Sequence, residues 1–370
     1  MMKKFLIIDT TWPINSRTER FKKTFQRYFD VVVVAWNRGV KSNNKVEDTY
    51  VLDTEIGYGN QLKKLIMLPI FFIHIYSVSK AEKPDTLFAS HWDSLICAVI
   101  LKLTWNWNVK IIYDCLDLPT FSNSLIRKLI VFLERVCLNF VSLTIFASRY
   151  FKQLYPSKLK SYVFENYPSH SLLNSCLEKP EWIKLYDEKI PKDCRNVAWI
   201  GVVRYFNIIE KILLAIKDTN IYFFVFGDGP ELEKVIEAVN DHKLNDQVVF
   251  FGRYKTSELK HIYEKSDLVW AAYPTNDFNA IYAISNKYFE CSFFEKRIIL
   301  SRKTKMAEGI KQNPSVILVD EYSSVDIRDK ILSNIKLEKY DKYESDTFWE
   351  DHEEAFIDFL KNIINTKQIP

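Results

Sequence analysis

Residues 196–227 read NVAWIGVVRYFNIIEKILLAIKDTNIYFFVFG, and this stretch decides the fold. Both of its ends are apolar runs of strand length, and the segment between them carries apolar residues at helical spacing near residues 208–217. Strands without polar alternation are typical of a parallel sheet covered on both faces, and a helix between two such strands is their usual connection. The stretch therefore predicts one strand–helix–strand unit of a doubly wound α/β domain.

The same alternation runs through most of the chain. On the C-terminal side we predict further strands at residues 248–252, 268–273 and 297–301, with helices at residues 231–240, 258–265 and 287–294. On the N-terminal side we predict strands at residues 4–9, 31–36, 86–90, 109–114, 143–148 and 162–166, with helices at residues 17–28, 95–103 and 125–140. We therefore expect an N-terminal Rossmann-like domain at residues 1–167, a proline-containing linker at 168–195, a C-terminal Rossmann-like domain at 196–345 and an amphipathic helix within 346–370.

Length, charge and cysteine usage narrow the function classes. A chain of 370 residues is long enough for two domains. The net charge of +4 is too small for a general nucleic-acid binder, although it suits a protein that visits an anionic membrane surface. The cysteines are scattered without a CxxC pair, so we expect reduced, buried thiols. They are Cys97, Cys115, Cys137, Cys176, Cys194 and Cys291.

No stretch of the sequence is typical of a targeting or membrane-spanning segment. The apolar run near the N-terminus is too short for a signal peptide. Residues 65–78 are the most apolar, but Pro69 and His74 interrupt them, and they are fewer than the roughly 20 needed to span a bilayer. We expect a buried or membrane-resting helix there, in a cytoplasmic protein that works in solution or at the inner face of the cell membrane.

Candidate binding residues follow the predicted strands of the C-terminal half. In open parallel sheets, ligands bind beyond the carboxyl ends of the strands. Arg204 follows such a strand and could neutralise a diphosphate, although a solvated surface arginine fits its position as well. Residues 227–230 (GDGP) could turn backbone N–H groups toward a base or a phosphate, but an ordinary strand-to-helix turn would read the same way.

A second group of candidates opens the helix predicted at residues 287–294. Asn286, Lys287 and the helix N-terminus could hold a diphosphate, and Glu290 could bind a ribose hydroxyl pair. The alternative is that Asn286 only caps the helix and Glu290 lies on a solvated face.

Together these segments carry a resemblance. NVAWIGVVRYFNIIEKILLAI, YFFVFGDGPELEKV, VVFFGRYKTSELKHIYEKSDLVWAAY and SNKYFE resemble, in order and spacing, the donor domain of GT-B glycosyltransferases. More narrowly, they resemble the group 1 (family four) retaining transferases that build bacterial surface polysaccharides, and the resemblance covers residues 196–311. It implies two tandem Rossmann-like domains facing a cleft, with the terminal helix packed back on the N-terminal one.

The resemblance also implies an activity. It is that of a retaining glycosyltransferase of the hexosyltransferase type, with a UDP- or GDP-linked sugar as co-substrate and a saccharide or lipid-linked saccharide as acceptor. Such enzymes supply capsular polysaccharide, exopolysaccharide or O-antigen. No cofactor and no metal ion are expected, and the sequence has no acidic DxD cluster in a suitable loop. Basic residues of the first half fit an acceptor embedded in a membrane, although a solvated helix face explains them as well. They are Lys22, Lys23, Arg27, Lys63 and Lys64.

Site residues follow from the resemblance residue by residue. It makes Arg204 and Lys287 the stabilisers of the departing diphosphate, Glu290 the ribose ligand, and His91 a contact of the donor sugar or its phosphate, where a purely structural histidine is the alternative. The remaining donor-binding residues that it implies are Gly201, Gly227, Asp228, Gly229, Pro230, Asn286 and Tyr288. Either Asp114 or Asp117 could serve as a general base in an inverting enzyme, or only orient its loop in a retaining one.

The chain departs from the family pattern at three places. The family has a lysine shortly after the arginine, whereas here the next lysine, Lys211, stands seven positions after Arg204. Tyr282 stands eight positions before Glu290, where the family has an acidic residue. The glycine-rich turn after the first strand is replaced by residues 11–17 (TWPINSR). Two alternatives to a transferase stay open. One is a sugar-nucleotide epimerase of the same fold, and the other, motivated by the Tyr282 departure, is a non-catalytic GT-B partner that stabilises a true transferase.

Overall fold

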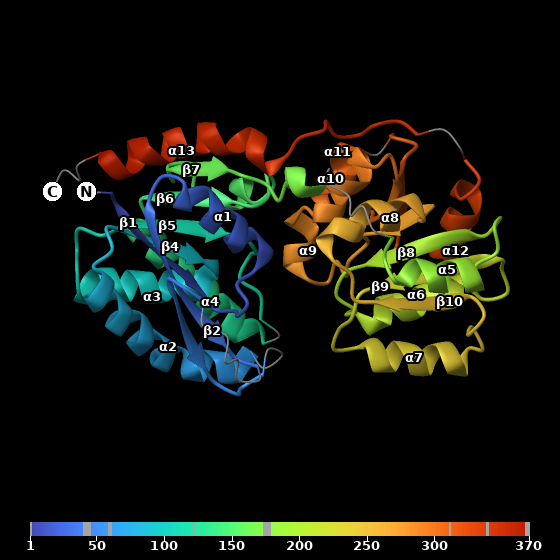
Figure 1. Cartoon of the computed structure of the whole chain (residues 1–370), viewed down its shortest axis with the longest axis horizontal. Helices are drawn as coiled ribbons and strands as arrows, with labels where there is room; N and C mark the ends of the chain where they lie inside the picture. Colours follow the sequence, from blue (N-terminus) through green and yellow to red (C-terminus); the bar gives the residue numbers. More distant parts are fainter. Residues whose placement is uncertain are drawn as a thin grey trace. The chain divides into compact units, whose positions relative to one another are not determined.

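The structure is a computed structural model, and it describes residues 2–39, 46–57, 61–121, 123–172, 179–310, 312–337 and 340–366. The chain divides into two compact units, which Figure 1 shows with their elements labelled. Unit 1 comprises Met1–Glu165 and His352–Pro370, and unit 2 comprises Asn166–Asp351. The chain therefore passes between the units twice. Residues 168–195, where we predicted a linker, fall within unit 2.

Unit 1 is built on a seven-stranded parallel sheet in the order β3-β2-β1-β4-β5-β6-β7. Its strands are β1 (Lys4–Asp9), β2 (Asp30–Asn37), β3 (Thr49–Asp53), β4 (Thr86–Ser90), β5 (Lys110–Cys115), β6 (Leu143–Phe146) and β7 (Ser161–Val163). The apolar run of β2 is buried along its whole length from Val31, because helices cover both faces of the sheet. The chain reverses direction across the sheet between β1 and β4, so their carboxyl ends form the switch point.

Helices cover the two faces of this sheet separately, as Figure 1 shows. One face carries α1 (Ser16–Gln26) and most of α13 (Trp349–Asn365); the other carries α2 (Gln61–Glu82), α3 (His91–Thr104) and α4 (Ser124–Cys137). Right-handed crossovers place them this way, because the strands before and after the switch point progress in opposite directions. Short 3-10 turns lie at Leu138–Phe140 (η1) and Lys152–Leu154 (η2).

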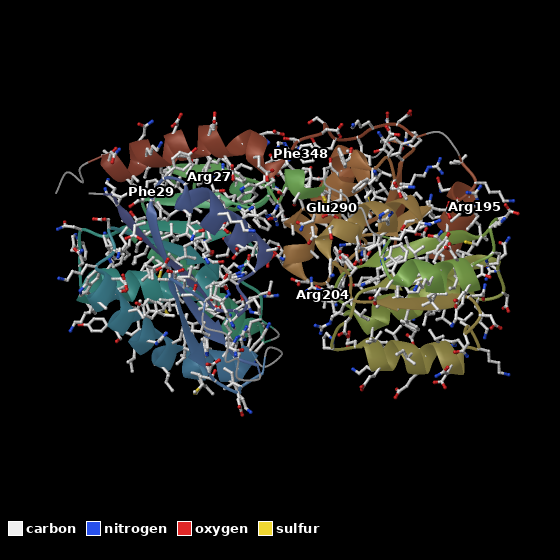
Figure 2. The ribbon with its side chains drawn as sticks, viewed as in Figure 1. Arg27, Phe29, Arg195, Arg204, Glu290 and Phe348 are labelled. Atoms are coloured by element: carbon white, nitrogen blue, oxygen red, sulfur yellow. The ribbon has the colours of Figure 1, made fainter. Side chains whose placement is uncertain are left out.

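The terminal helix α13 packs against α1 through aromatic side chains. Phe356 is fully buried, and its ring centroid lies 5.6 Å from that of Phe21 and 5.2 Å from that of Phe164. Beside this cluster, the buried carboxylate of Glu353 accepts a hydrogen bond of 2.6 Å from Arg27, which is labelled in Figure 2.

Unit 2 is built on a six-stranded parallel sheet in the order β10-β9-β8-β11-β12-β13, with its switch point between β8 and β11. Its strands are β8 (Arg195–Ile200), β9 (Ile221–Phe226), β10 (Val248–Gly252), β11 (Leu268–Trp270), β12 (Arg297–Ser301) and β13 (Val316–Val319). Its helices are α5 (Trp182–Lys189), α6 (Phe206–Ile216), α7 (Leu232–Asp241), α8 (Leu259–Glu264), α9 (Phe278–Tyr282), α10 (Asn286–Phe293), α11 (Lys305–Gly309) and α12 (Ser324–Asn334), with 3-10 turns η3 (His170–Leu172) and η4 (Thr256–Glu258).

The core of unit 2 lies between the sheet and these helices, where Val197, Ile212 and Phe223 are fully buried. The predicted fold class, two doubly wound parallel-sheet domains in tandem, is confirmed. The cysteines within the described residues are free thiols: Cys97, Cys115, Cys137 and Cys291 are buried, and Cys194 is half-buried. Cys176 lies outside the described residues.

Candidate active site

Two loops meet at the carboxyl ends of β8 and β9 in unit 2. The backbone N–H of Val203 donates to the carbonyl of Asp228 at 3.0 Å, which ties one loop to the other. A Cβ atom on Gly227 would overlap the carbonyl of Gly201, and one on Gly229 would overlap the backbone of Val203. These two glycines are therefore required for the close approach of the loops, whatever ligand binds there.

Lys287 reaches this pair of loops from the first turn of α10. Ser285 is the N-cap of the helix, and its hydroxyl accepts from the backbone N–H of Lys287 at 3.3 Å. The helix-capping alternative for Asn286 is therefore wrong: Ser285 has the extended backbone of an N-cap, and Asn286 is the first helical residue. A Cβ atom on Gly201 would lie 3.6 Å from Lys287 Nζ, so the ammonium lies directly over the β8 loop.

The surroundings of Lys287 keep its ammonium charged. Burial alone would lower the pKa of Lys287, but Coulombic interactions with nearby groups outweigh burial and raise it. The interacting groups are, in order of strength, Tyr273, Glu290, Tyr254 and Cys291. The switch point of unit 2 thus presents a fixed positive charge beside glycine backbone, an arrangement suited to an anion.

Glu290 is held in place by a buried tyrosine. The hydroxyl of Tyr263, on α8, donates to Glu290 Oε2 at 2.5 Å. Burial raises the pKa of Tyr263 well above its ordinary value, so this phenol remains a donor. Glu290 itself is half-buried, so it does not lie on the solvated helix face that was the alternative for it.

Arg204 lies at the carboxyl end of β8 and is exposed. Figure 2 shows it on the same side of unit 2 as Glu290, with Arg195, at the start of β8, on the other side. Its guanidinium lies over the Tyr205 ring, 4.8 Å from the centroid, and within the part of the chain that the structure describes it forms no ion pair. Arg204 therefore has its charge available for a ligand.

The other residues that we expected to bind the sugar-nucleotide donor have different surroundings. Asp228 accepts from Arg253 at 2.9 Å, and this hydrogen bond lowers the pKa of the Asp228 carboxyl. The expectation that Pro230 lies in the first helical turn is wrong: Glu231 is the N-cap of α7 and Leu232 its first residue, so Pro230 lies in the loop before the helix. Tyr288 is buried, with its ring 5.2 Å from that of Tyr343, so its side chain belongs to the core of unit 2.

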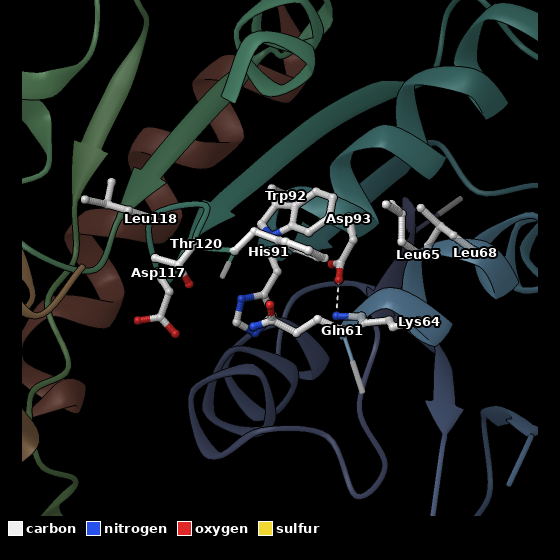
Figure 3. Close-up of a pocket in the computed structure, with 11 residues that line it drawn as sticks. Gln61, Lys64, Leu65, Leu68, His91, Trp92, Asp93, Asp117, Leu118 and Thr120 are labelled. Atoms are coloured by element: carbon white, nitrogen blue, oxygen red, sulfur yellow. Dashed lines mark ion pairs between the residues drawn. The ribbon is translucent and has the colours of Figure 1, made fainter. Parts of the chain in front are cut away.

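In unit 1, His91 lines a cavity of about 160 Å³, shown in Figure 3. His91 begins α3 with a φ of +72°, a conformation that is uncommon for a residue with a side chain. The remaining lining comes from the start of α2, the start of α3 and the loop after β5. It comprises Gln61, Lys64, Leu65, Leu68, Trp92, Asp93, Asp117, Leu118, Thr120 and Phe121.

The acidic residues near this cavity are held differently. Asp93 is buried and paired with Lys64, and although burial raises its pKa, the attraction of Lys64 outweighs burial and lowers it. Asp114 forms a buried ion pair with Arg17 at 2.9 Å. The interpretation of Asp114 as a general base is therefore wrong, because the Arg17 guanidinium occupies its carboxylate, and Asp117 is the one of the two that lines the cavity.

The unusual loop after β1 is closed by its own side chains. Asp9, the last residue of β1, accepts from the backbone N–H of Thr11 at 2.9 Å and from the side chain of Asn15 at 2.7 Å. The carboxylate therefore binds the backbone donor that a glycine-rich turn would offer to a phosphate.

Sequence reasoning missed three tyrosines of the unit 2 site. Tyr254 and Tyr273 come after β10 and β11, so the rule that ligands bind beyond the carboxyl ends could have identified them. Tyr263 lies on α8, and nothing in the sequence indicated that it donates to Glu290. Among the described residues, no group of three or more His, Cys, Asp and Glu side chains could hold a metal ion.

Comparisons with known proteins agree with this geometry. A family model described as glycosyl transferases group 1 matches residues 190–345, and no curated protein matches the chain. Sucrose-phosphate synthase from Thermosynechococcus elongatus has a TM-score of 0.71 at 12% identity, over 98% of this chain and 96% of that one.

Two further structures were solved with nucleotides. HepE from Anabaena, in complex with UDP and glucose, has a TM-score of 0.67 at 14% identity, over 98% of this chain and 100% of that one. UDP-GlcNAc 2-epimerase from Methanocaldococcus jannaschii, in complex with UDP-GlcNAc and UDP, has a TM-score of 0.65 at 13% identity, over 97% of this chain and 99% of that one. At these identities the likeness shows the fold alone. The expected resemblance to the group 1 glycosyl transferases is confirmed for residues 190–345, which match that family model, and the chain has the GT-B fold.

Proposed function

We propose that the chain is a glycosyltransferase that moves a sugar from a nucleoside-diphosphate sugar to a saccharide or lipid-linked saccharide acceptor. The observation that supports the proposal is that two cationic side chains belong to the carboxyl-end region of the unit 2 sheet: the Lys287 ammonium lies over Gly201, and Arg204, which forms no ion pair among the described residues, follows β8 three positions after Gly201. It lies within the part of the chain that matches the group 1 transferases. UDP-sugars are the first donors to test, because two neighbours of the same fold were solved with UDP, and GDP-sugars come next.

Within this proposal, unit 2 binds the donor and stabilises the leaving group. Arg204 and Lys287, with the N-terminal turn of α10 and Asn286, face the diphosphate, where negative charge develops as the glycosidic bond breaks. Cationic groups that are already in position stabilise the negative charge of the transition state effectively, because they need not reorganise during the reaction. Glu290, oriented by Tyr263, receives the ribose hydroxyls, and the Gly201 and 227–230 loops form the wall beside the base.

The cavity of unit 1 is the proposed acceptor site. It offers polar groups from His91, Asp117 and Gln61 beside apolar Leu65 and Leu68, a mixture that suits a sugar carried on an apolar group. We assign His91 to the contact with the transferred sugar or its phosphate. His91→Ala should therefore lower the rate of transfer. A contact with the sugar alone would leave UDP binding unchanged, whereas a contact with the phosphate would make UDP binding weaker in the variant.

Two finer properties belong to the proposal. Transfer proceeds with retention of the anomeric configuration, as the resemblance to retaining enzymes implies, and NMR of the product would show it. The protein works in the cytoplasm or at the inner face of the cell membrane, in the synthesis of a surface polysaccharide.

A nucleotide-sugar assay separates the proposal from its alternatives. The chain is first screened with UDP-, GDP- and CMP-sugars for thermal stabilisation, since a ligand at 100 times its Kd adds about 2.7 kcal/mol. The stabilising sugar nucleotide is then incubated with the protein and a membrane extract as acceptor source, and followed by NMR. Release of the nucleoside diphosphate with the sugar transferred supports the proposal.

Other outcomes would favour the alternatives. A changed configuration of the sugar, still attached to its nucleotide, would show an epimerase. No stabilisation by any sugar nucleotide would favour a non-catalytic partner and contradict the proposed function.

A further inference from the structure

Helix α2 has one apolar side that is exposed among the described residues of unit 1. Ile66 and Ile73 are 66% and 65% exposed, and Leu62 and Ile70, at helical spacing from them, are exposed too. The opposite side packs on the sheet, where Phe71 stacks on Trp36 with 5.0 Å between ring centroids. The expectation that this segment is too short to span a bilayer is wrong: α2 has 22 residues and by length and composition could cross a membrane. Its packing against the sheet shows that it lies along the surface of unit 1.

The neighbouring helices extend this apolar surface. On α4, Leu125 and Phe132 are 73% and 62% exposed, and Leu129 and Val136 lie on the same side. Helix α3 lies between α2 and α4, in contact with both, and exposes Leu103 near its end. Helices α1 and α13, on the other face of the same sheet, expose no large apolar side chain within their described residues. We call the exposed side of α2, α3 and α4 the apolar helix face.

The charges on this face have one sign. Helices α2, α3 and α4 contain seven Lys and Arg residues and three acidic residues. Each of the three acidic residues is either paired or buried: Asp93 pairs with Lys64, Glu82 pairs with Lys4, and Glu134 is buried. Lys63, Arg127 and Lys128 are exposed. Of the basic residues that the sequence suggested for membrane contact, Lys22, Lys23 and Arg27 belong to α1 or its end, on the opposite face.

We propose that the apolar helix face binds an anionic lipid bilayer, with α2, α3 and α4 lying in the plane of the interface. Apolar side chains on one side of a helix, together with Lys and Arg, are what partitioning into the headgroup region requires. A large exposed apolar surface is also typical of a site that binds a membrane or another protein. A second copy of the chain fits less well, because a two-fold interface would bring equal basic charges together.

This surface adjoins the proposed acceptor cavity. Gln61 and Leu65, from the start of α2, line the cavity, and Phe121 lines it just before α4 begins. Binding of the face to a bilayer would therefore bring the cavity mouth close to headgroups, where a lipid-linked acceptor presents its sugar. The link to the acceptor rests on the proposed function, whereas bilayer binding does not need a donor or an acceptor.

Co-sedimentation of the full-length protein with phospholipid vesicles tests the proposal. One set of vesicles contains phosphatidylcholine alone, and the other contains phosphatidylcholine with one third phosphatidylglycerol. A variant with Ile66→Ser, Ile73→Ser, Leu129→Ser and Phe132→Ser removes apolar contacts from α2 and α4. The matched control has Val325→Ser and Leu332→Ser, two exposed apolar residues of α12 in unit 2. All four changes in the variant are at exposed positions, so its thermal unfolding should match that of the parent.

We expect the parent and the control to sediment with anionic vesicles, and this binding to weaken as salt rises. The four-residue variant should lose more than about tenfold in vesicle affinity, because the removed side chains supply the inserted apolar area. Equal binding of parent and variant, or no binding of the parent, would overturn the proposal. A parent that is dimeric by analytical ultracentrifugation, with a monomeric variant, would instead assign the face to a second copy. UDP binding by unit 2, measured on the same samples, reports separately on the proposed function.

Discussion

Phe356 provides a quantitative test of how α13 is attached to unit 1. Its side chain is fully buried, and its ring contacts lie at centroid distances of 5.6 Å to Phe21 and 5.2 Å to both Tyr162 and Phe164. Replacing a buried Phe by Ala removes its transfer free energy and leaves a cavity, at a cost of about 3–5 kcal/mol. For a unit of this size each kcal/mol lowers the Tm by about 2–4 °C, so Phe356→Ala should lower it by roughly 6–20 °C.

Differential scanning calorimetry with and without UDP would make the measurement, because a ligand that binds unit 2 shifts the unfolding of that unit alone. Phe359→Ala is the matched control: Phe359 lies one turn along the same helix, contacts Tyr162 at 5.3 Å and is only half-buried, so a smaller loss is expected. Truncation after residue 346 should destabilise unit 1 more than either substitution. A loss below about 1 kcal/mol for Phe356→Ala would refute this account, since it lies beneath the range for any buried Phe.

Three further predictions concern the loops, the metal and the pH dependence. Gly227→Ala should destabilise unit 2 by about 1–3 kcal/mol in chemical unfolding, because the new Cβ would overlap the Gly201 carbonyl; Gly252→Ala, with open space around it, should cost less, and equal losses would contradict the argument. Transfer activity should persist in excess EDTA, because the cationic groups supply the charge, and loss of activity with rescue by Mn²⁺ or Mg²⁺ would be the contrary result. Burial raises the folded-state pKa of Glu134, so its stabilising contribution is greatest below its ordinary pKa of 4.5 and falls as pH rises through the raised pKa. Glu134→Gln should therefore flatten this part of the stability–pH profile, and an unchanged slope would count against it.

Most of the strands could be predicted because their buried runs lack polar alternation, but β13, a buried apolar strand, was missed. The prediction at residues 31–36 falls within β2, and those at 86–90 and 297–301 coincide with β4 and β12. Strand β3 was missed because it is a short, half-exposed edge strand whose sequence, TYVLD, has mixed polarity. Helix α5 was missed because Pro180 and Pro191, which flank it, were interpreted as linker residues.

The single residues of the candidate site could be predicted from the sequence, but the contacts between them could not. Arg204, Lys287 and Glu290 were found because each follows a strand or opens a helix. The approach of Lys287 to Gly201 could not be predicted, since it depends on how α10 packs against a loop 86 positions earlier in the chain. Likewise, the sequence placed Asp114 and Asp117 together after one strand, and only tertiary structure shows that Arg17 binds the first.

Titration of UDP into the parent protein and into Lys287→Ala and Arg204→Ala variants tests the central claim most directly. Each contact is charge-assisted and worth about 1.5–3 kcal/mol, so each variant should bind UDP about tenfold to a hundredfold more weakly. Glu290→Gln should weaken UDP binding through the ribose, while Lys330→Ala, which removes an exposed lysine on α12, should change nothing. Calorimetric Kd values that follow this order are the predicted result. Unchanged Kd values in the Lys287→Ala and Arg204→Ala variants, with the fold intact, would contradict the account.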